Sequence, residues 1–216
     1  MSRILILFSS HDGQTRRIAS RVGEVLARAG HETVLRFAGE PGPRAAIEAS
    51  DAVIVGAPIR YGHYPKRFEA LVREHLAALR ARPNAFFSVC LTAGGPGAKP
   101  AVASGYVRDF VERTGWQPGD TAILAGALLY RKYNPFIRLM MRFIVGRAGG
   151  ETDTSRDYEY TDWDAVERFA TRFAAAAARG SERSLHQHRV DPPSELETHG
   201  FQGAHLAEAE RAMQVD

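Results

Sequence analysis

The chain has 216 residues, of which 44% are hydrophobic, and these values predict one α/β domain with a full core and some surplus chain. The net charge of +3 does not favour nucleic acid as a partner, and the single cysteine, Cys90, excludes an internal disulfide and any cysteine-based metal cluster. No run of eighteen apolar residues occurs and the chain enters a predicted strand directly, so we expect no membrane span, no signal peptide and a cytoplasmic location.

Apolar runs alternate with stretches of helical periodicity along most of the chain. The predicted strands cover residues 3–8, 32–37, 52–57, 85–91 and 121–127. The predicted helices cover residues 14–29, 43–49, 65–82, 101–114 and 161–178, the last one beginning with a cap at Thr161 and stopping at Gly180. Continuous apolar strands separated by helices predict a doubly wound, five-stranded parallel sheet with helices on both faces.

Two segments depart from this alternation. Residues 128–160 form an insertion between the fifth strand and the last helix that is far longer than an ordinary connection. After Gly180 the sequence becomes polar and loses its periodicity, so we expect a domain over residues 1–179 and a flexible tail over residues 180–216. Four histidines are scattered through that tail without a close pair one helical turn apart, so we expect no metal site.

The first predicted strand ends in a polar turn, Ser9-Ser-His-Asp-Gly-Gln-Thr15, that leads into a helix. Free backbone N–H groups, the helix dipole and the hydroxyls of Ser10 and Thr15 make such a turn an anion site. The turn has one glycine, Gly13, and no lysine after it, which distinguishes it from the dinucleotide and Walker A loops. It suits the phosphate of a mononucleotide, the alternative being an ordinary capped turn.

Two more loops follow strands at the same edge of the sheet, where ligands bind in open parallel sheets. The loop at 57–64 offers Arg60 and the planar side chains of Tyr61, His63 and Tyr64, although a tyrosine there could instead cover a helix terminus. The loop at 90–97 is rich in glycine, which lets the backbone approach a ligand closely, and Cys90 is expected to be an inert core thiol. The three loops together suit flavin mononucleotide (FMN).

The insertion contains a basic, acid-free stretch over residues 130–149. Asn134-Pro135 predicts the start of a helix, and the following ten residues are apolar except for Arg138 and Arg142, which share one stripe. Such a helix covers the sheet edge or a partner subunit, lies on a membrane surface, or forms the wall of a pocket for an apolar, carboxylated substrate. The sequence leaves these alternatives open.

Several stretches resemble a known family. They are Ile4-Leu-Ile-Leu-Phe-Ser9 with Asp12-Gly-Gln-Thr-Arg16, Ile59-Arg-Tyr-Gly-His-Tyr64, Ala125-Gly-Ala-Leu128, Gly149-Gly-Glu-Thr-Asp153 and Tyr160-Thr-Asp-Trp163. With them the chain resembles flavodoxin-like proteins and, more narrowly, the menaquinone-dependent protoporphyrinogen IX dehydrogenases of bacterial haem synthesis. The resemblance implies the sheet order 2-1-3-4-5. The chain departs from this family's pattern in two places. Its loop at 93–97 is rich in glycine, where a more basic loop is expected, and its tail has no counterpart in the family.

The resemblance also implies the site. FMN would be bound by Ser9, Ser10, His11, Asp12, Gly13, Gln14, Thr15, Ala57, Pro58, Ile59, Arg60, Tyr61, Gly62, His63, Val89, Cys90, Leu91, Thr92, Ala93, Gly94 and Gly95. The chemistry would take place at the flavin N5, with no catalytic side chain assigned and no metal. Protoporphyrinogen IX would lose electrons in three two-electron steps to menaquinone or another quinone, at the inner face of the cell membrane. Arg131, Lys132, Arg138 and Arg142 are candidates for contacts with substrate propionates or lipid phosphates.

Three other functions fit parts of the same pattern. An NAD(P)H:quinone oxidoreductase would use the same fold but require a nicotinamide. A flavodoxin-type electron carrier usually has a strongly acidic surface, whereas this chain is net basic. A regulatory protein on this fold would not bind flavin at all. The sequence does not determine the oligomeric state, and a homo-oligomer is compatible with it.

Overall fold

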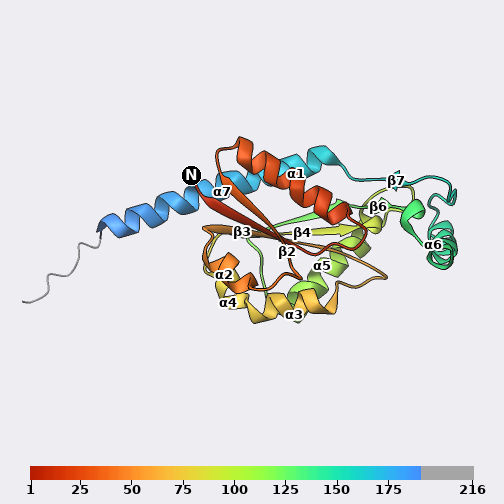
Figure 1. Ribbon diagram of the computed structural model, residues 1–216, viewed down its shortest axis with the longest axis horizontal. Helices are drawn as coiled ribbons and strands as arrows, with labels where there is room; N and C mark the ends of the chain where they lie inside the picture. The colour runs from red at the N-terminus through yellow and green to blue at the C-terminus, as the bar shows by residue number, and fades with distance from the viewer. Residues whose placement is uncertain (191–216) are drawn as a thin grey trace, which may run out of the picture. The chain divides into compact units, whose positions relative to one another are not determined.

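The computed structural model describes residues 1–190, and side chains as far as residue 180. Its main sheet has five parallel strands in the order β2-β1-β3-β4-β5, which confirms the predicted topology (Figure 1). The strands are β1 (Arg3–Phe8), β2 (Glu32–Phe37), β3 (Ala52–Pro58), β4 (Asn84–Cys90) and β5 (Asp120–Ala125). The central strands are apolar throughout because both faces of the sheet are covered.

The side chains of β1 alternate between two hydrophobic cores. Ile4 and Ile6 belong to the core on one face of the sheet, which α1 (Gln14–Arg28) and the first part of α7 (Trp163–Val190) cover (Figure 1). Leu5 and Leu7 belong to the core on the other face. That face is covered by α2 (Pro43–Glu48), α3 (Lys66–Glu74), α4 (Leu76–Arg80) and α5 (Pro100–Thr114).

The insertion folds beyond the carboxyl ends of the strands, at the end of the domain opposite the N-terminus (Figure 1). It contains β6 (Ala127–Leu128), the 3-10 turn η2 (Tyr130–Lys132), α6 (Pro135–Arg147) and β7 (Tyr158–Glu159), and β6 pairs antiparallel with β7. The predicted start of the insertion's helix is confirmed, since the Asn134 side chain accepts a hydrogen bond of 2.9 Å from the Ile137 N–H. Tyr130 is fully buried and donates its hydroxyl proton to the Glu151 carbonyl oxygen at 2.8 Å. The insertion therefore has a small core of its own.

Three predicted features of the helices are wrong. The helix expected over 65–82 is divided at His75 into α3 and α4. The last helix does not stop at Gly180 but continues to Val190, because one helical glycine costs only about 1 kcal/mol and good helix formers surround it. Its cap is Asp162, whose carboxylate accepts the Ala165 N–H at 3.0 Å, while the Thr161 hydroxyl donates to the Ala125 carbonyl oxygen instead.

The rest of the predicted tail, residues 191–216, lies outside the described part of the chain. Within residues 1–190, none of the helices combines the length and the apolar composition needed to cross a membrane.

Candidate functional site

The carboxyl ends of β1, β3 and β4 open into a cavity of about 410 Å³, the position where open parallel sheets bind ligands. It is lined by His11, Asp12, Gln14, Thr15, Pro58, Ile59, Arg60, Tyr61, Gly62, Val89, Cys90, Leu91, Thr92, Tyr106, Gly126, Ala127, Tyr133, Met141 and Ile144. All three loops predicted from the sequence thus meet at one cavity, and residues of the insertion close part of it.

The loop that follows β1, four residues of which line one end of the cavity, has the features of an anion site. Gly13, with φ of +98°, is the cap residue of α1, and no side chain of the described residues caps the first helical N–H groups. The hydroxyl oxygen of Ser10 is buried and has no hydrogen-bond partner among the described residues. A buried hydroxyl costs free energy unless it is paired, so this loop is completed by a ligand that accepts hydrogen bonds. The residues present fit a phosphate group.

The loop after β3 is a tight turn at the rim of the cavity. Arg60 and His63 exchange two backbone hydrogen bonds of 3.0 Å, and the two residues between them, Tyr61 and Gly62, have φ of 50° and 83°. Both lie in the left-handed region, as a primed two-residue turn requires. The Tyr61 side chain is 58% exposed, with the Arg60 guanidinium 5.5 Å from its ring centroid. His63 is exposed and does not line the cavity, and neither does the buried Ala57.

Tyr64 does not offer its ring to a ligand, contrary to the expectation from the sequence. It is buried in the core beside Phe110, and its hydroxyl donates to Ser88 Oγ at 2.7 Å. Burial raises the pKa of the Tyr64 hydroxyl, so this group remains protonated.

The loop after β4 contributes to two recesses. Residues 89–92 line the main cavity, and Gly94 and Gly95 line a smaller apolar recess of about 140 Å³ between this loop and α6. Tyr160 lies so close to Gly95 that an added Cβ would meet its ring at 2.9 Å, which requires a glycine there. Burial raises the pKa of the Cys90 thiol, consistent with an inert thiol rather than a nucleophile. Four other predicted ligands, Ser9, Ser10, Gly13 and Ala93, line neither recess.

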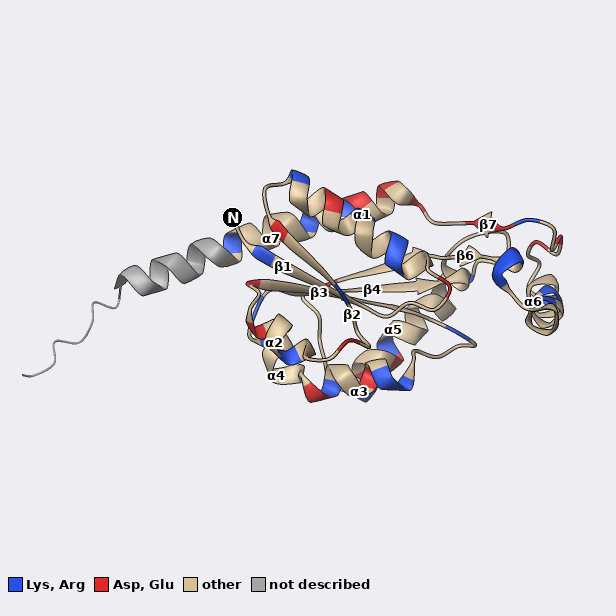
Figure 2. Cartoon of the chain, in the orientation of Figure 1, with Lys and Arg blue, Asp and Glu red and all other residues tan. Residues whose placement is uncertain are grey.

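The four cations predicted for substrate or lipid contacts have different surroundings. Arg138 donates from Nε to the Tyr130 carbonyl oxygen at 3.1 Å and from Nη2 to the Tyr133 carbonyl oxygen at 3.2 Å. Arg131, Lys132 and Arg142 are exposed, and Figure 2 shows that α6 carries basic residues. Among these three, Lys132 donates from Nζ to the Asp12 carbonyl oxygen at 3.0 Å.

A polar network attaches the end of the insertion to the start of α1. Gln14 donates from Nε2 to Glu159 Oε1 at 3.0 Å and to Thr161 Oγ1 at 2.9 Å. Arg17 donates to Glu159 Oε2 at 2.9 Å. Burial would raise the pKa of the Glu159 carboxyl, but the hydrogen bonds from Arg17 and Gln14 outweigh it and the pKa is lowered. The insertion and the anion-binding loop are therefore one connected structure.

Sequence reasoning missed several residues that line the cavity: Tyr106, Gly126, Ala127, Tyr133, Met141 and Ile144. Gly126 directly follows β5, so the rule that ligands bind at carboxyl ends could have found it. Burial, with the nearby Asp12 charge, raises the pKa of the Tyr133 hydroxyl to about 12, so Tyr133 offers a proton donor at neutral pH. The helical residues Tyr106, Met141 and Ile144 carry no motif that marks them.

Fold and cavity together define a flavodoxin-like flavoprotein, and comparisons with known proteins agree. A family model described as "Flavodoxin domain" matches residues 5–155. The protoporphyrinogen IX dehydrogenase [quinone] of Escherichia coli K12 is 40% identical over 173 residues, which cover 80% of this chain and 94% of that protein. The protein of the same name from Leishmania major is 39% identical over 176 residues, covering 80% of this chain and 75% of that protein.

Among solved structures, a short-chain flavodoxin associated with a bacterial microcompartment superposes with a TM-score of 0.50 at 13% identity, covering 82% of this chain and 99% of the other. That likeness concerns the fold alone. The chain belongs to the flavodoxin domain family and, within it, to the family of the quinone-dependent protoporphyrinogen IX dehydrogenases. The cofactor that this membership indicates is a flavin.

Proposed function

We propose that this chain is an FMN-dependent dehydrogenase that oxidises protoporphyrinogen IX to protoporphyrin IX in haem biosynthesis and transfers the electrons to a quinone. The observation that carries the proposal is the 40% identity to a protoporphyrinogen IX dehydrogenase [quinone] over 94% of that relative's length. The cavity at the sheet edge supports it, because it has an apolar wall and lies beside a loop with the features of an anion site.

The donors of the anion-binding loop support FMN among the flavins. One helix N-terminus and one unpaired hydroxyl, that of Ser10, suit a single terminal phosphate. Bound FMN would supply the capacity to accept two electrons from one compound and pass them to another. The phosphate would be bound by the loop at 10–15, and the ring by residues 58–62 and 89–92.

The protein side chains orient the reactants and exclude water. Met141 and Ile144 of α6 present apolar atoms to the cavity, which limits the access of solvent. Arg60, at the rim, is suited to a bidentate contact with a substrate carboxylate. Tyr133 keeps its proton at neutral pH and offers it to an acceptor in the cavity. Cys90 takes no part as a nucleophile, because burial keeps its thiol protonated.

The test is anaerobic turnover of the FMN-loaded protein. Mixing with protoporphyrinogen IX and a menaquinone analogue should produce porphyrin fluorescence that requires both FMN and the quinone. Growth of fluorescence only after a nicotinamide is added, or none at all while NADPH reduces the bound flavin, would refute the proposal and favour an NAD(P)H:quinone oxidoreductase. Chromatography of the released flavin distinguishes FMN from FAD.

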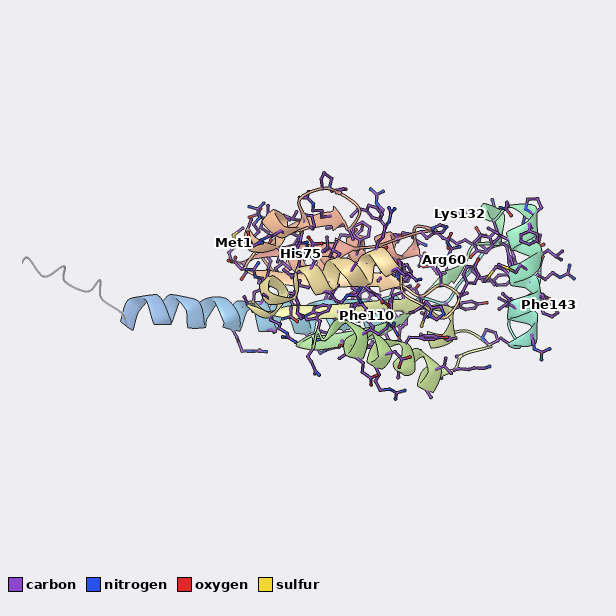
Figure 3. The ribbon with its side chains drawn as sticks, turned by 90° about the horizontal axis from the view of Figure 1, so that it is seen from below. Met1, Arg60, His75, Phe110, Lys132 and Phe143 are labelled. Carbon is purple, nitrogen blue, oxygen red and sulfur yellow. The ribbon has the colours of Figure 1, made fainter. Side chains whose placement is uncertain are left out.

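The proposal includes a peripheral contact between α6 and the inner face of the cell membrane, where an apolar quinone resides. Phe136, Leu139 and Phe143 stand on the outer side of α6 at helical spacing and are 76%, 67% and 69% exposed (Figure 3 labels Phe143). The exposed cations Arg131 and Arg142 lie on the same acid-free stretch. Apolar side chains beside cations match a bilayer with acidic headgroups.

Flotation with phosphatidylglycerol-containing vesicles tests this contact. The wild type should float with the vesicles, and a Phe136→Ser, Leu139→Ser, Phe143→Ser variant should not. A matched triple change of exposed apolar residues outside the insertion, Leu35→Ser, Phe37→Ser and Val102→Ser, should leave flotation intact. Equal flotation of the α6 variant would rule out the membrane contact.

A further inference from the structure

Lys132 belongs to the insertion, but its ammonium group lies at the loop that follows β1. Its Nζ donates to the Asp12 carbonyl oxygen at 3.0 Å. A Cβ placed on Gly13, the cap residue of α1, would stand 3.6 Å from the same Nζ. Figure 3 shows Lys132 at the end of the domain where α6 stands, on the same side as Arg60. A residue 120 positions away in sequence therefore places a positive charge beside the free N–H groups of a helix N-terminus.

The backbone that carries Lys132 is firmly fixed. Lys132 is the last residue of η2, and its N–H donates to the Leu129 carbonyl oxygen at 3.0 Å. The first residue of that turn, Tyr130, is fully buried, and Arg138 donates to the Tyr130 carbonyl oxygen. The ammonium has three protons, of which the Asp12 carbonyl takes one, so two remain for another acceptor.

The anion-binding loop itself lacks a strong cation. Residues 9–15 contain no lysine or arginine, and they include one acid, Asp12, which opposes the binding of an anion. A phosphate monoester carries a charge of about −1.5 to −2 at neutral pH. The amides and hydroxyls of the loop bind an anion without a full positive charge, and the Lys132 ammonium adds such a charge within hydrogen-bond distance of this loop.

We propose that Lys132 is a direct ligand of the cofactor's phosphate, so that the insertion takes part in cofactor binding. This inference rests on the proposed function, because it requires a flavin that ends in a phosphate. It assigns Lys132 to the cofactor rather than to substrate propionates or lipid headgroups. The insertion thus contacts this region twice, through Lys132 of η2 at Asp12 and through Glu159 of β7 at Gln14 and Arg17 of α1.

The test compares FMN with riboflavin, which has the same ring system and no phosphate. Purified full-length protein is stripped of flavin and titrated with each compound, with quenching of flavin fluorescence as the readout. Lys132→Met should weaken FMN binding about tenfold. This value is at the lower end of the range for a hydrogen bond from a charged group, because the site is partly exposed to solvent. Riboflavin affinity should not change, and Lys132→Arg should restore FMN binding. Arg131→Met, the same charge change one residue away on a side chain that is exposed like that of Lys132, should affect neither ligand.

Other results would overturn the inference. Unchanged FMN affinity in Lys132→Met would mean that the lysine does not touch the phosphate. Equal weakening of FMN and riboflavin would mean that it only shapes the cavity, and loss of vesicle flotation with FMN binding intact would assign it to lipid phosphate. If the variant does not fold, the inference is tested on the wild type, in which rising ionic strength must weaken the binding of FMN more than the binding of riboflavin. If the wild type turns over substrate and Lys132→Met binds FMN normally, only this inference is refuted. If the wild type does not bind FMN, the proposed function is refuted.

Discussion

Arg138 provides the sharpest test of how the insertion is built. Its guanidinium donates to two backbone carbonyl oxygens, those of Tyr130 and Tyr133, at 3.1 and 3.2 Å. Arg138→Met keeps the aliphatic length of the side chain and removes both hydrogen bonds. Each bond from a charged donor contributes at most about 1.5–3 kcal/mol, and water can reach these partly buried carbonyls in the variant. The loss is therefore about 2 kcal/mol in all.

This loss should be local, because the insertion can open without unfolding the sheet. About 2 kcal/mol corresponds to roughly 30-fold faster amide hydrogen exchange across residues 128–150, read by mass spectrometry of peptides. Peptides from β1 to β4 should exchange at the wild-type rate. Arg142→Met is the matched control, since Arg142 is an exposed cation on the same helix. If amide exchange stays within about twofold of the wild-type rate and the KM for the porphyrinogen is raised, this role is refuted and Arg138 is assigned to substrate binding.

Three further changes test other parts of the structure. Gly56→Ala should lower the free energy of unfolding by about 2–3 kcal/mol in denaturant titrations, because its Cβ would meet the Phe87 ring at 2.0–2.5 Å, and an unchanged midpoint would contradict this packing. Glu159→Gln should cost about 0.5 kcal/mol at neutral pH, where Glu159 is ionised and paired with Arg17. The pKa of Glu159 in the folded protein is lowered, so this contribution is present above the unfolded pKa and is lost as the pH falls through the folded one. A difference in stability between the two proteins that does not shrink as the pH is lowered would disprove the pairing. Asn134→Ala removes the cap of α6 and should speed amide exchange in that helix about fivefold, and unchanged exchange would show that the cap contributes nothing.

The sheet was predictable because its signal is local. Each strand is a run of apolar residues bounded by turn residues, and five such runs identify a parallel sheet before any contact is known. The sequence also placed three loops at the edge where the cavity opens, since that edge follows from the direction of the strands. It could therefore be predicted from the sequence that loop residues such as Thr15 and Ile59 lie at the cavity.

Two errors of the sequence-based prediction arise because tertiary contacts override local signals, and one arises because a local signal was given too much weight. The sequence pattern predicts that the last helix ends at Gly180, but one glycine does not end a helix when the residues around it are good helix formers. Thr161 reads as a cap, but its hydroxyl is used by the Ala125 carbonyl, and Asp162 caps the helix instead. Tyr64 reads as a ligand contact, but Ser88 offers its hydroxyl a buried partner.

The partners of the basic residues could not be read from spacing. Arg138 and Lys132 look alike in the sequence, yet one stabilises its own insertion and the other reaches the loop after β1. Which carbonyl a long side chain finds depends on where η2 lies over the sheet, and that is set by packing around Tyr130. The cavity residues Met141 and Ile144 were missed for the same reason, because only the fold shows which side chains of α6 border the cavity.

The most direct test of the proposed activity is its stoichiometry. FMN-loaded protein is mixed anaerobically with protoporphyrinogen IX and excess menaquinone analogue, and porphyrin fluorescence and quinol absorbance are recorded together without any nicotinamide. A quinone-dependent dehydrogenase should form three quinols for every protoporphyrin IX, because aromatisation of the ring removes six electrons. Porphyrin formation without quinol, or quinol formation that requires a nicotinamide, would contradict the proposed function.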